Sequence, residues 1–373
     1  MITLTMIAIA LGLFLLRVPV SISMGIASLI GFFMLGVPVA IIPARMIGGV
    51  DSFALLAVPF FILAGNLMNA GGVTERIFAF ARSLVGWISG GLAQVNIVAS
   101  IIFAGMSGSA LADLAGLGAV EIRAMRKNGY PVPFSTAVTL SSCTIGPLIP
   151  PSIILVIYGL STNTSIGRLF LGGIIAGLVV AASLMIFVFI HVRATKAEWA
   201  KPEPFVFRDV LHTGFFGLPA LFAPVVILGS LIAGVTTPSE LGAIATLYAL
   251  FVGLLYRQFT WANLKAALIN TVTMTSVIMY LFAIAGIMNF VITRERVAHN
   301  ASELMATYIT SPFIGILLIN LFLIFVGMFL EGPVAILVIA PILLEVVADF
   351  GMGPVQFGIM LSFNLLIGMI TPP

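Results

Sequence analysis

Long, unbroken runs of apolar residues recur along the whole chain, and they restrict the fold more than any other feature. One run, 166–190, reads IGRLFLGGIIAGLVVAASLMIFVFI and contains a single charge. Apolar runs of about 18 to 25 residues match the thickness of a bilayer when they form helices. With 61% hydrophobic and 8% charged residues, the chain lacks the polar surface of a soluble domain. The alternation of apolar and polar residues typical of a membrane barrel is missing. We therefore predict an all-α polytopic membrane protein.

Residue types that are rare in the chain exclude several functional classes. The single cysteine, Cys143, rules out a disulfide framework and a cysteine metal cluster. The three histidines, His191, His212 and His299, are scattered and argue against a histidine metal site. No basic stripe supports binding of nucleic acid. The N-terminal segment lacks a basic region and a clear cleavage site, so we interpret it as a retained membrane segment.

The apolar segment 2–36 is too long for one span. A straight helix of this length would extend roughly 52 Å, against a hydrocarbon core of about 30 Å. Because Arg17 and Pro19 divide the segment, we predict two helices with Arg17 at an interface. Further spans are predicted at 52–70, 166–190, 213–233, 238–256 and 266–292, an interfacial segment at 38–48, and amphipathic segments at 73–86 and 296–310.

The chain contains an internal duplication. Residues 105–151 align with 327–373 at a constant offset of 222 and without a gap. Only seven of the 47 positions are identical, but five of these pairs are helix breakers: Gly105/Gly327, Gly129/Gly351, Gly146/Gly368, Pro150/Pro372 and Pro151/Pro373. The other two are Met106/Met328 and Ile145/Ile367. Breakers that match at a fixed offset indicate a duplicated unit whose breaks are important.

The distribution of Lys and Arg predicts the orientation of the two copies. With the polar segment 191–211 in the cytoplasm, 12 basic residues lie inside and four (Arg45, Arg168, Arg294 and Arg296) lie outside. The 12 are Arg17, Arg76, Arg82, Arg123, Arg126, Lys127, Arg193, Lys196, Lys201, Arg208, Arg257 and Lys265. This orientation requires 105–127 and 327–349 to be helical re-entrant hairpins. The return loop of the first is basic and that of the second is acidic, which predicts an inverted repeat, a hallmark of secondary transporters.

These arguments give the predicted domain organisation. The first inverted repeat covers 1–190, with a hairpin and broken helix at 91–161; a cytoplasmic linker covers 191–211; and the second repeat covers 212–373, with its hairpin and broken helix at 313–373. By analogy with the first repeat, we expect roughly 40–55 further residues after Pro373.

The helix breaks are the candidate site. Unwound backbone in hydrocarbon is tolerated only where it is buried in protein or lines a cavity. The breaks are Ser107-Gly108-Ser109, Thr144-Ile145-Gly146-Pro147, Leu330-Glu331-Gly332-Pro333 and Gly368 to Pro373. Their hydroxyl and carbonyl oxygens, with few full charges, are typical of a hard-cation site, and helix N-termini suit anions. The alternative is that Gly and Ser only allow close helix packing and Pro only kinks a helix.

Several polar residues have two interpretations. Asp113 and Glu331 are intramembrane carboxylates that serve ion or proton transport, or else cap helix N-termini. Ser142 and Asn364 are equivalent in the repeat, which favours a place at the site. Asn66 can instead bond neighbouring helices, Glu240 can cap a helix, and Cys143 can be a small buried residue.

A membrane aspartyl hydrolase using Asp113 and Glu331 lacks a matching motif. A channel is less consistent with broken repeats than alternating access is.

Motifs along nearly the whole chain resemble those of one family, the DctM-like large membrane subunit of tripartite ATP-independent periplasmic (TRAP) transporters. They are DSFALLAVPFFILAGNLMNAGG (51–72), GMSGSALADLAGLGAVEIRAMRKNGY (105–130), GPLIPPSI (146–153), TTPSELGA (236–243), FVGMFLE (325–331) and FGIMLSFNLLIGMITPP (357–373).

The resemblance implies an elevator-type, sodium-driven importer of organic anions in the bacterial inner membrane. Its partners would be a small DctQ-like membrane subunit and a periplasmic DctP-like binding protein. Carried onto this sequence, it implies sodium ligands at Ser107, Gly108, Ser109, Thr144, Gly146, Pro147, Met328, Glu331, Gly332, Gly368 and Thr371, and substrate contacts at Ser109, Asp113, Ser142, Asn364, Pro150 and Pro372. The substrate would be a C4-dicarboxylate, sugar acid or sialic acid. A cation-coupled anion symporter that needs no binding protein is the alternative.

Overall fold

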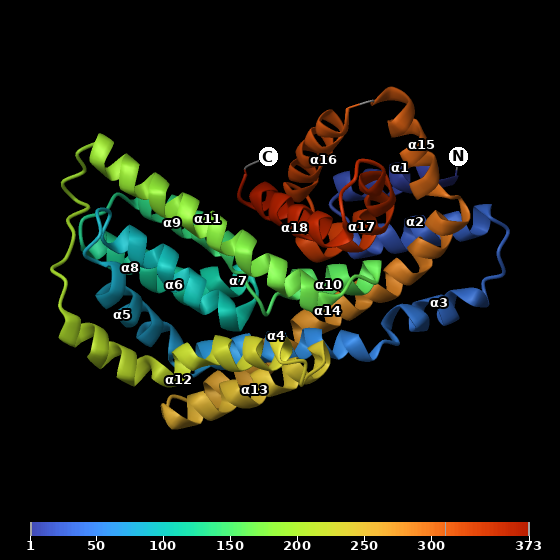
Figure 1. The fold of residues 1–373 in the computed structure, drawn as a ribbon. Coiled ribbons are helices and arrows are strands. Elements are labelled where there is room, and N and C mark those ends of the chain that lie inside the picture. The colour runs from blue at the N-terminus through green and yellow to red at the C-terminus, as the bar shows by residue number, and fades with distance from the viewer. Residues whose placement is uncertain (1, 310, 372–373) are drawn as a thin grey trace. The chain divides into compact units, whose positions relative to one another are not determined.

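The computed structural model describes residues 2–309 and 311–371, and all regular elements in these ranges are helices (Figure 1). Six of them are long and apolar enough to cross a membrane: 53–70, 166–194, 207–231, 238–255, 261–294 and 332–349. This confirms the predicted all-helical membrane fold. The long N-terminal apolar segment is divided as expected, because α1 (Ile2–Leu15) and α2 (Val20–Met34) flank a turn in which Arg17 has a φ of 64°.

The described residues form two compact units, which do not coincide with the two halves of the sequence. Unit 1 contains the described residues of 1–56, 157–165 and 273–373, and unit 2 contains 57–156 and 166–272. The remaining helices are α3 (Ile41–Val50), α4 (Ala57–Ala70), α5 (Val73–Val85), α6 (Leu92–Ser107), α7 (Ala110–Asp113), α8 (Ala119–Lys127), α9 (Val132–Ser142), α10 (Ile153–Thr162), α11 (Ile166–Ala194), α12 (Phe207–Ile232), α13 (Pro238–Leu255), α14 (Trp261–Arg294), α15 (Val297–Tyr308), α16 (Pro312–Gly327), α17 (Gly332–Asp349) and α18 (Pro354–Ile370).

Helix α6 is the centre of unit 2, where α4, α5, α8, α9, α11 and α12 surround it. Small residues bring the backbones close together, as expected where lipid removes the hydrophobic drive for helix association. A Cβ placed on Gly65 of α4 would lie 3.3 Å from the Cα of Ser107, and one on Gly105 would lie 2.6 Å from the Cγ of Pro224 in α12. The first hairpin is therefore tightly enclosed by helices of its own unit.

Polar residues add specific bonds inside unit 2. The Asn66 amide donates to Thr271 Oγ1 at 2.9 Å and accepts from Asn270 at 2.9 Å, so Asn66 connects two helices. Thr237 and Glu240 form a reciprocal capping box at the start of α13, as predicted for TTPSELGA. Asn66 thus bonds neighbouring helices and Glu240 caps a helix, the two structural roles expected from the sequence.

The second hairpin belongs to unit 1, and a glycine pair sets its packing. A Cβ on Gly327 of α16 would lie 2.9 Å from the Cα of Leu365 and 3.1 Å from that of Gly368, both in α18. Two glycines facing each other allow the helices to touch backbone to backbone. Elsewhere in unit 1, Phe32 of α2 packs on Phe290 of α14 at 5.1 Å between ring centroids.

The same turn follows both hairpins. Gly129 has a φ of 83° and Gly351 a φ of 79°, a conformation that favours glycine. The Gly129 N–H donates to the Arg126 carbonyl, and the Tyr130 N–H donates to the Met125 carbonyl. At an offset of 222, the Gly351 N–H donates to the Ala348 carbonyl and the Met352 N–H to the Val347 carbonyl. This pair of bonds is a Schellman-type helix end. The repeated geometry supports the duplication inferred from matched glycines, while the repeat boundaries stay a prediction.

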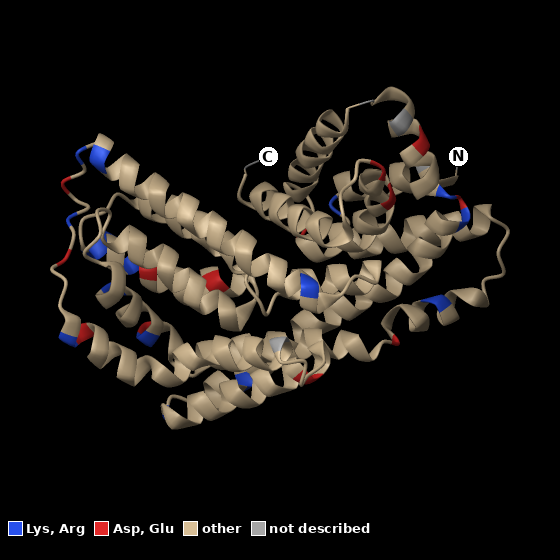
Figure 2. Ribbon diagram, in the orientation of Figure 1, with Lys and Arg blue, Asp and Glu red and all other residues tan. Residues whose placement is uncertain are grey.

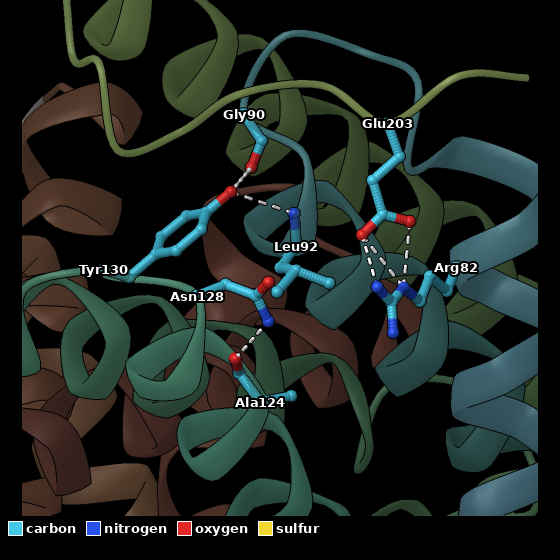
Figure 3. Close-up of polar contacts among 7 residues, drawn as sticks. All are labelled: Arg82, Gly90, Leu92, Ala124, Asn128, Tyr130 and Glu203. Atoms are coloured by element: carbon cyan, nitrogen blue, oxygen red, sulfur yellow. Dashed lines mark hydrogen bonds and ion pairs between the residues drawn. The ribbon is translucent and has the colours of Figure 1, made fainter.

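The polar segment after α11 lies against unit 2 as a strap, residues 195–206. Arg82 donates three hydrogen bonds to the Glu203 carboxylate, at 2.6, 2.9 and 3.0 Å (Figure 3). The Trp199 ring lies 5.0 Å from that of Tyr130. The Tyr130 hydroxyl donates to Gly90 and accepts from the Leu92 N–H, and burial raises the pKa of Tyr130 to about 12, so this donor is retained at neutral pH. The linker is thus attached to the base of the first hairpin.

Candidate functional site

The tip of the first hairpin is a two-residue break between helices. Helix α6 ends at Ser107, and Gly108 takes a left-handed φ of 60°. Ser109 is extended and its hydroxyl accepts the Ala112 N–H at 3.4 Å, which caps the short helix α7. The chain reverses here because glycine tolerates the left-handed conformation and serine supplies the cap. The predicted break is therefore present, with Gly108 and Ser109 between the helices and Ser107 as the last residue of α6.

The tip contacts the broken helix directly. The Ile153 N–H, at the start of α10, donates to the Gly108 carbonyl at 3.3 Å. A Cβ on Gly108 would overlap the Pro151 carbonyl and lie 3.2 Å from the Cα of Ser152. A Cβ on Gly146 would lie 3.5 Å from the Ser109 carbonyl oxygen. Two breaks that are about 40 residues apart in the sequence thus pack against each other.

The irregular segment between α9 and α10 is buried throughout residues 143–152. A 3-10 turn (Cys143–Ile145) ends α9, and the Thr144 hydroxyl donates to the Ser141 carbonyl at 2.7 Å. The Pro150–Pro151 peptide is cis. Ser152, which the sequence analysis did not select, donates to the Pro147 carbonyl and accepts the Leu155 N–H at 3.2 Å. A serine that precedes an apolar helix is a usual N-cap, and this pattern was available in the sequence.

Buried polar atoms without a protein partner mark the same hairpin. Among the described residues they include Ser107 Oγ at the tip, both carboxylate oxygens of Asp113, and Oε1 of Glu121. The Ser100 hydroxyl faces Asp113, yet neither Asp113 oxygen makes a hydrogen bond of ordinary geometry. Buried polar groups are nearly always satisfied in proteins, so these atoms are candidates for binding a ligand or an ion. Glu121 was missed because its segment, AVEIRAMRK, reads as a charged surface helix.

A π turn separates the two buried carboxyl groups. Residues Leu114–Gly118 form this wider turn between α7 and α8. A Cβ on Gly116 would be 2.7 Å from the Cγ of Asn69, so the Asn69 amide of α4 lies against the turn. Such turns occur frequently at functional sites. The π turn at Leu114–Gly118 was not predicted from the sequence.

The repeat-equivalent residues Ser142 and Asn364 both bond to an asparagine of the preceding hairpin helix. The Ser142 hydroxyl donates to Asn96 Oδ1 at 2.6 Å, and the Asn96 amide donates to Thr139 at 2.7 Å. In unit 1, the Asn364 amide donates to Asn320 Oδ1. Each copy therefore uses this position to connect its broken helix to its hairpin.

Replacing Ser142 by alanine should lower the stability of the protein. It should leave the substrate concentration for half-maximal uptake nearly unchanged. The change leaves Asn96 Oδ1 buried without its donor, which costs about 1–3 kcal/mol. Thermal unfolding and uptake kinetics of the purified transporter would measure both effects. Ser183→Ala on the exposed face of α11 is the control and should be neutral. An unchanged melting temperature with a much weaker apparent affinity for substrate would instead place Ser142 at the substrate.

The second hairpin tip is built differently. Leu330 continues a turn by donating its N–H to Val326, and the exposed Glu331 precedes α17 without a side-chain cap. Gly332 starts α17, and Met328 follows the last residue of α16. The Thr371 hydroxyl donates to the Ile367 carbonyl at 2.8 Å. Pro372 lies outside the described residues. This tip lacks the left-handed glycine that forms the first tip.

Comparison with known proteins identifies sequence relatives along the whole chain. The family model described as "Tripartite ATP-independent periplasmic transporter, DctM component" matches residues 7–373. The sialic acid TRAP transporter large permease protein SiaM of Vibrio cholerae is 43% identical over 88% of this chain and 77% of its own length. The 2,3-diketo-L-gulonate TRAP transporter large permease protein YiaN of Escherichia coli is 38% identical over 90% and 79%. The C4-dicarboxylate TRAP transporter large permease protein DctM of Vibrio cholerae is 35% identical over 98% and 85%.

A solved structure shows a similar fold. The YdaH transporter of Alcanivorax borkumensis aligns with a TM-score of 0.61 over 88% of this chain and 77% of its own. At 11% sequence identity, the likeness concerns the fold alone. The helical fold is therefore supported independently of the sequence relatives.

Proposed function

The chain belongs to the DctM component family of tripartite ATP-independent periplasmic transporters, and from this premise we propose that it imports an organic anion together with sodium ions. It is a multi-pass inner-membrane permease and not an enzyme. The substrates named for its relatives are sialic acid, 2,3-diketo-L-gulonate and C4-dicarboxylates. All three are carboxylates, so the proposed substrate is a small carboxylate of this kind.

The unpartnered hydroxyl of Ser107 is the main support for sodium coupling. It is buried at a helix end, beside the left-handed Gly108 and the break at Gly146–Ser152. Carbonyls of unwound backbone and helix C-terminal ends are the usual sodium ligands of transporters with broken helices. Ser107, Gly108, Ser109, Thr144, Gly146 and Pro147 would supply hydroxyl and carbonyl oxygens there. The residue types fit a hard monovalent cation that prefers oxygen.

The second hairpin would contribute an equivalent set: Met328, Glu331, Gly332, Gly368 and Thr371. The close contact of Gly327 with Gly368 places the end of α16 beside the end of α18, as Gly108 is placed beside Ser152. The segments that form the first tip and the facing break, 105–113 and 144–152, contain no Lys or Arg that could pair with a carboxylate substrate. Helix N-termini and hydroxyls such as Ser109 would hold it, and Asp113 would favour the accompanying cation.

The tripartite family implies partner proteins. We propose a small DctQ-like membrane subunit and a DctP-like periplasmic binding protein that delivers the substrate. The exposed apolar surface of α11 and α12, which includes Ile175, Phe187, Phe215 and Val225, is available for lipid or a membrane partner. Conversion between outward and inward states would follow the elevator mechanism expected for inverted hairpin repeats.

Uptake by the reconstituted complex tests the proposal. Radiolabelled sialic acid, diketogulonate or succinate should enter proteoliposomes only with an inward sodium gradient and the cognate binding protein. Ser109→Leu should abolish sodium-dependent uptake while the protein stays folded, because leucine removes the hydroxyl and fills the tip. The milder Ser109→Ala guards against misfolding, and Ser183→Leu on exposed α11 is the matched control. Uptake that is indifferent to sodium, or normal coupling in both Ser109 variants, would reject the proposal.

A further inference from the structure

Helix α8 carries an exposed basic face at the base of the first hairpin. Arg123, Arg126 and Lys127 are exposed and follow one another at helical spacing, and Ala119 and Ile122 lie one turn earlier on the same side of the helix. Together these five residues line a groove of about 480 Å³. Within the described part of the chain, no ion pair of these three cations is recorded. A groove lined by two apolar residues and three cations suits an anion that has an apolar tail.

The basic residues are not needed to satisfy the end of their own helix. Cations in a last turn often neutralise the exposed carbonyls and the helix dipole. Here the carbonyls of Ala124, Met125 and Arg126 accept the N–H groups of Asn128, Tyr130 and Gly129. The Asn128 side chain donates a further bond to Ala124 at 2.8 Å (Figure 3). The three cations therefore remain available for an external partner.

In the second repeat, the equivalent face has partners within the protein. At the offset of 222, Arg123 corresponds to Glu345 and Lys127 to Asp349, so the charges are reversed. Helix α15 packs along α17, and two of its side chains contact these carboxylates, which are themselves exposed. His299 Nδ1 lies 3.5 Å from Glu345 Oε1, and the Ser302 hydroxyl donates to Asp349. The acidic face thus has its complement inside the protein.

In the first repeat, the corresponding helix does not pack beside the basic face. The counterpart of α15 at this offset is α5, since 297–308 corresponds to 75–86. Helix α5 packs instead against α6, α12 and the π turn, and has no extensive packing with α8 in the described residues. The basic face of α8 is therefore open to a partner from outside the hairpin.

The surroundings of this face have the composition of a membrane interface. Figure 2 shows Lys and Arg on α8, at the end of α11 and along the strap. The aromatic side chains of Trp87, Tyr130 and Trp199 lie at the same end, where Trp87 contacts Phe205 and Trp199 contacts Tyr130. Tryptophan and tyrosine concentrate at the level of lipid headgroups, and basic residues concentrate on the cytoplasmic side.

From these observations we propose that the basic face of α8 binds the headgroup of an anionic glycerophospholipid in the cytoplasmic leaflet. Arg123, Arg126 and Lys127 contact the phosphate, and Ile122 and Ala119 contact the start of an acyl chain. The lipid takes the place beside Arg123 and Lys127 that α15, with His299 and Ser302, has beside Glu345 and Asp349 in the second repeat. Because α8 is an arm of the hairpin, the lipid would stabilise the hairpin from its base.

Lipid binding by the purified full-length chain tests this proposal. Phosphatidylglycerol added to detergent-solubilised protein should raise the melting temperature more than phosphatidylcholine does, and native mass spectrometry should detect retained phosphatidylglycerol. The variant Arg123→Gln/Arg126→Gln/Lys127→Gln should bind phosphatidylglycerol at least tenfold more weakly. The variant Arg193→Gln/Lys196→Gln/Lys201→Gln removes three charges from α11 and the strap at the same end, and it should keep wild-type binding.

Three results would overturn the proposal. The first is an equal response of the α8 variant and the wild type to phosphatidylglycerol. The second is an equal loss in both triple variants, which would indicate diffuse charge attraction without a site. The third is full replacement of the lipid effect by millimolar inorganic phosphate or glycerol phosphate, which would identify a soluble anion as the ligand. None of these readouts depends on sodium coupling, so they are separable from the proposed function.

Discussion

Replacing Gly108 by alanine is expected to reduce uptake to background and to lower the melting temperature of the protein. Gly108 has a φ of 60°, where a Cβ costs roughly 1–2 kcal/mol. The larger effect is steric, because the new Cβ would overlap the Pro151 carbonyl and lie 2.8 Å from its carbon. These atoms are backbone and cannot rotate away as a side chain would. The tip must therefore separate from the break, and the oxygens proposed to bind sodium move apart.

A matched substitution separates the two causes. Gly129 has an even larger positive φ of 83°, but a Cβ there would meet nothing within 4 Å. Gly129→Ala therefore carries the conformational cost without the collision, and it should cost about 1 kcal/mol with uptake largely retained. Circular-dichroism melting and sodium-driven uptake of both variants provide the comparison. If Gly108→Ala transported as well as Gly129→Ala, the contact between the tip and the broken helix would not be required for transport.

The sequence allowed the helices and their interruptions to be predicted because both depend on local chemistry. Apolar length determined the spans, and Arg17 with Pro19 correctly divided the N-terminal segment. The matched pair Gly129 and Gly351 corresponds to one turn geometry, because left-handed φ values favour glycine at both places. The Ser107-Gly108-Ser109 break was predictable for the same reason.

Partners across helices were not predictable in this way. Ser142 bonds to Asn96, which lies 46 residues earlier, and no periodicity relates the two residues. The two compact units also cross the boundary between sequence halves, since 157–165 belongs with 273–373. The burial of Glu121 was hidden by its basic neighbours, although its spacing of four from the buried Met125 places both on one helix face. Long-range packing decides such features, and local patterns record it only weakly.

Replacing Asp113 by asparagine is expected to stabilise the protein and to abolish transport. Asp113 is 2% exposed, and Glu121, at 1%, is close enough to interact with it electrostatically. Among the described residues, the buried polar and charged side chains include no Lys, Arg or His that would compensate them. A buried carboxyl group without a partner is costly, whereas an amide of the same shape is less so. We expect a gain of about 0.5–2 kcal/mol in the free energy of unfolding.

The loss of transport follows from the position of Asp113. It lies one turn after the tip, and its N–H donates to the Ser109 carbonyl at 3.0 Å. Proteins retain such unfavourable groups where function needs them, so neutralisation should trade activity for stability. Glu121→Gln is the matched control, because it also relieves a buried carboxyl group but lies beyond the π turn, away from the tip. We expect it to stabilise the protein and to retain uptake.

Melting curves and sodium-driven uptake of the two variants distinguish the possible roles of Asp113. A stabilised but inactive Asp113→Asn beside an active Glu121→Gln would identify the Asp113 carboxyl as part of the transport machinery. A destabilised Asp113→Asn would show instead that Ser100 or another neighbour makes a structural bond to the carboxyl. Full activity in Asp113→Asn would remove Asp113 from the site, and the hydroxyl and backbone oxygens of Ser107 to Ser109 and of the facing break would then have to bind the cation without a nearby negative charge.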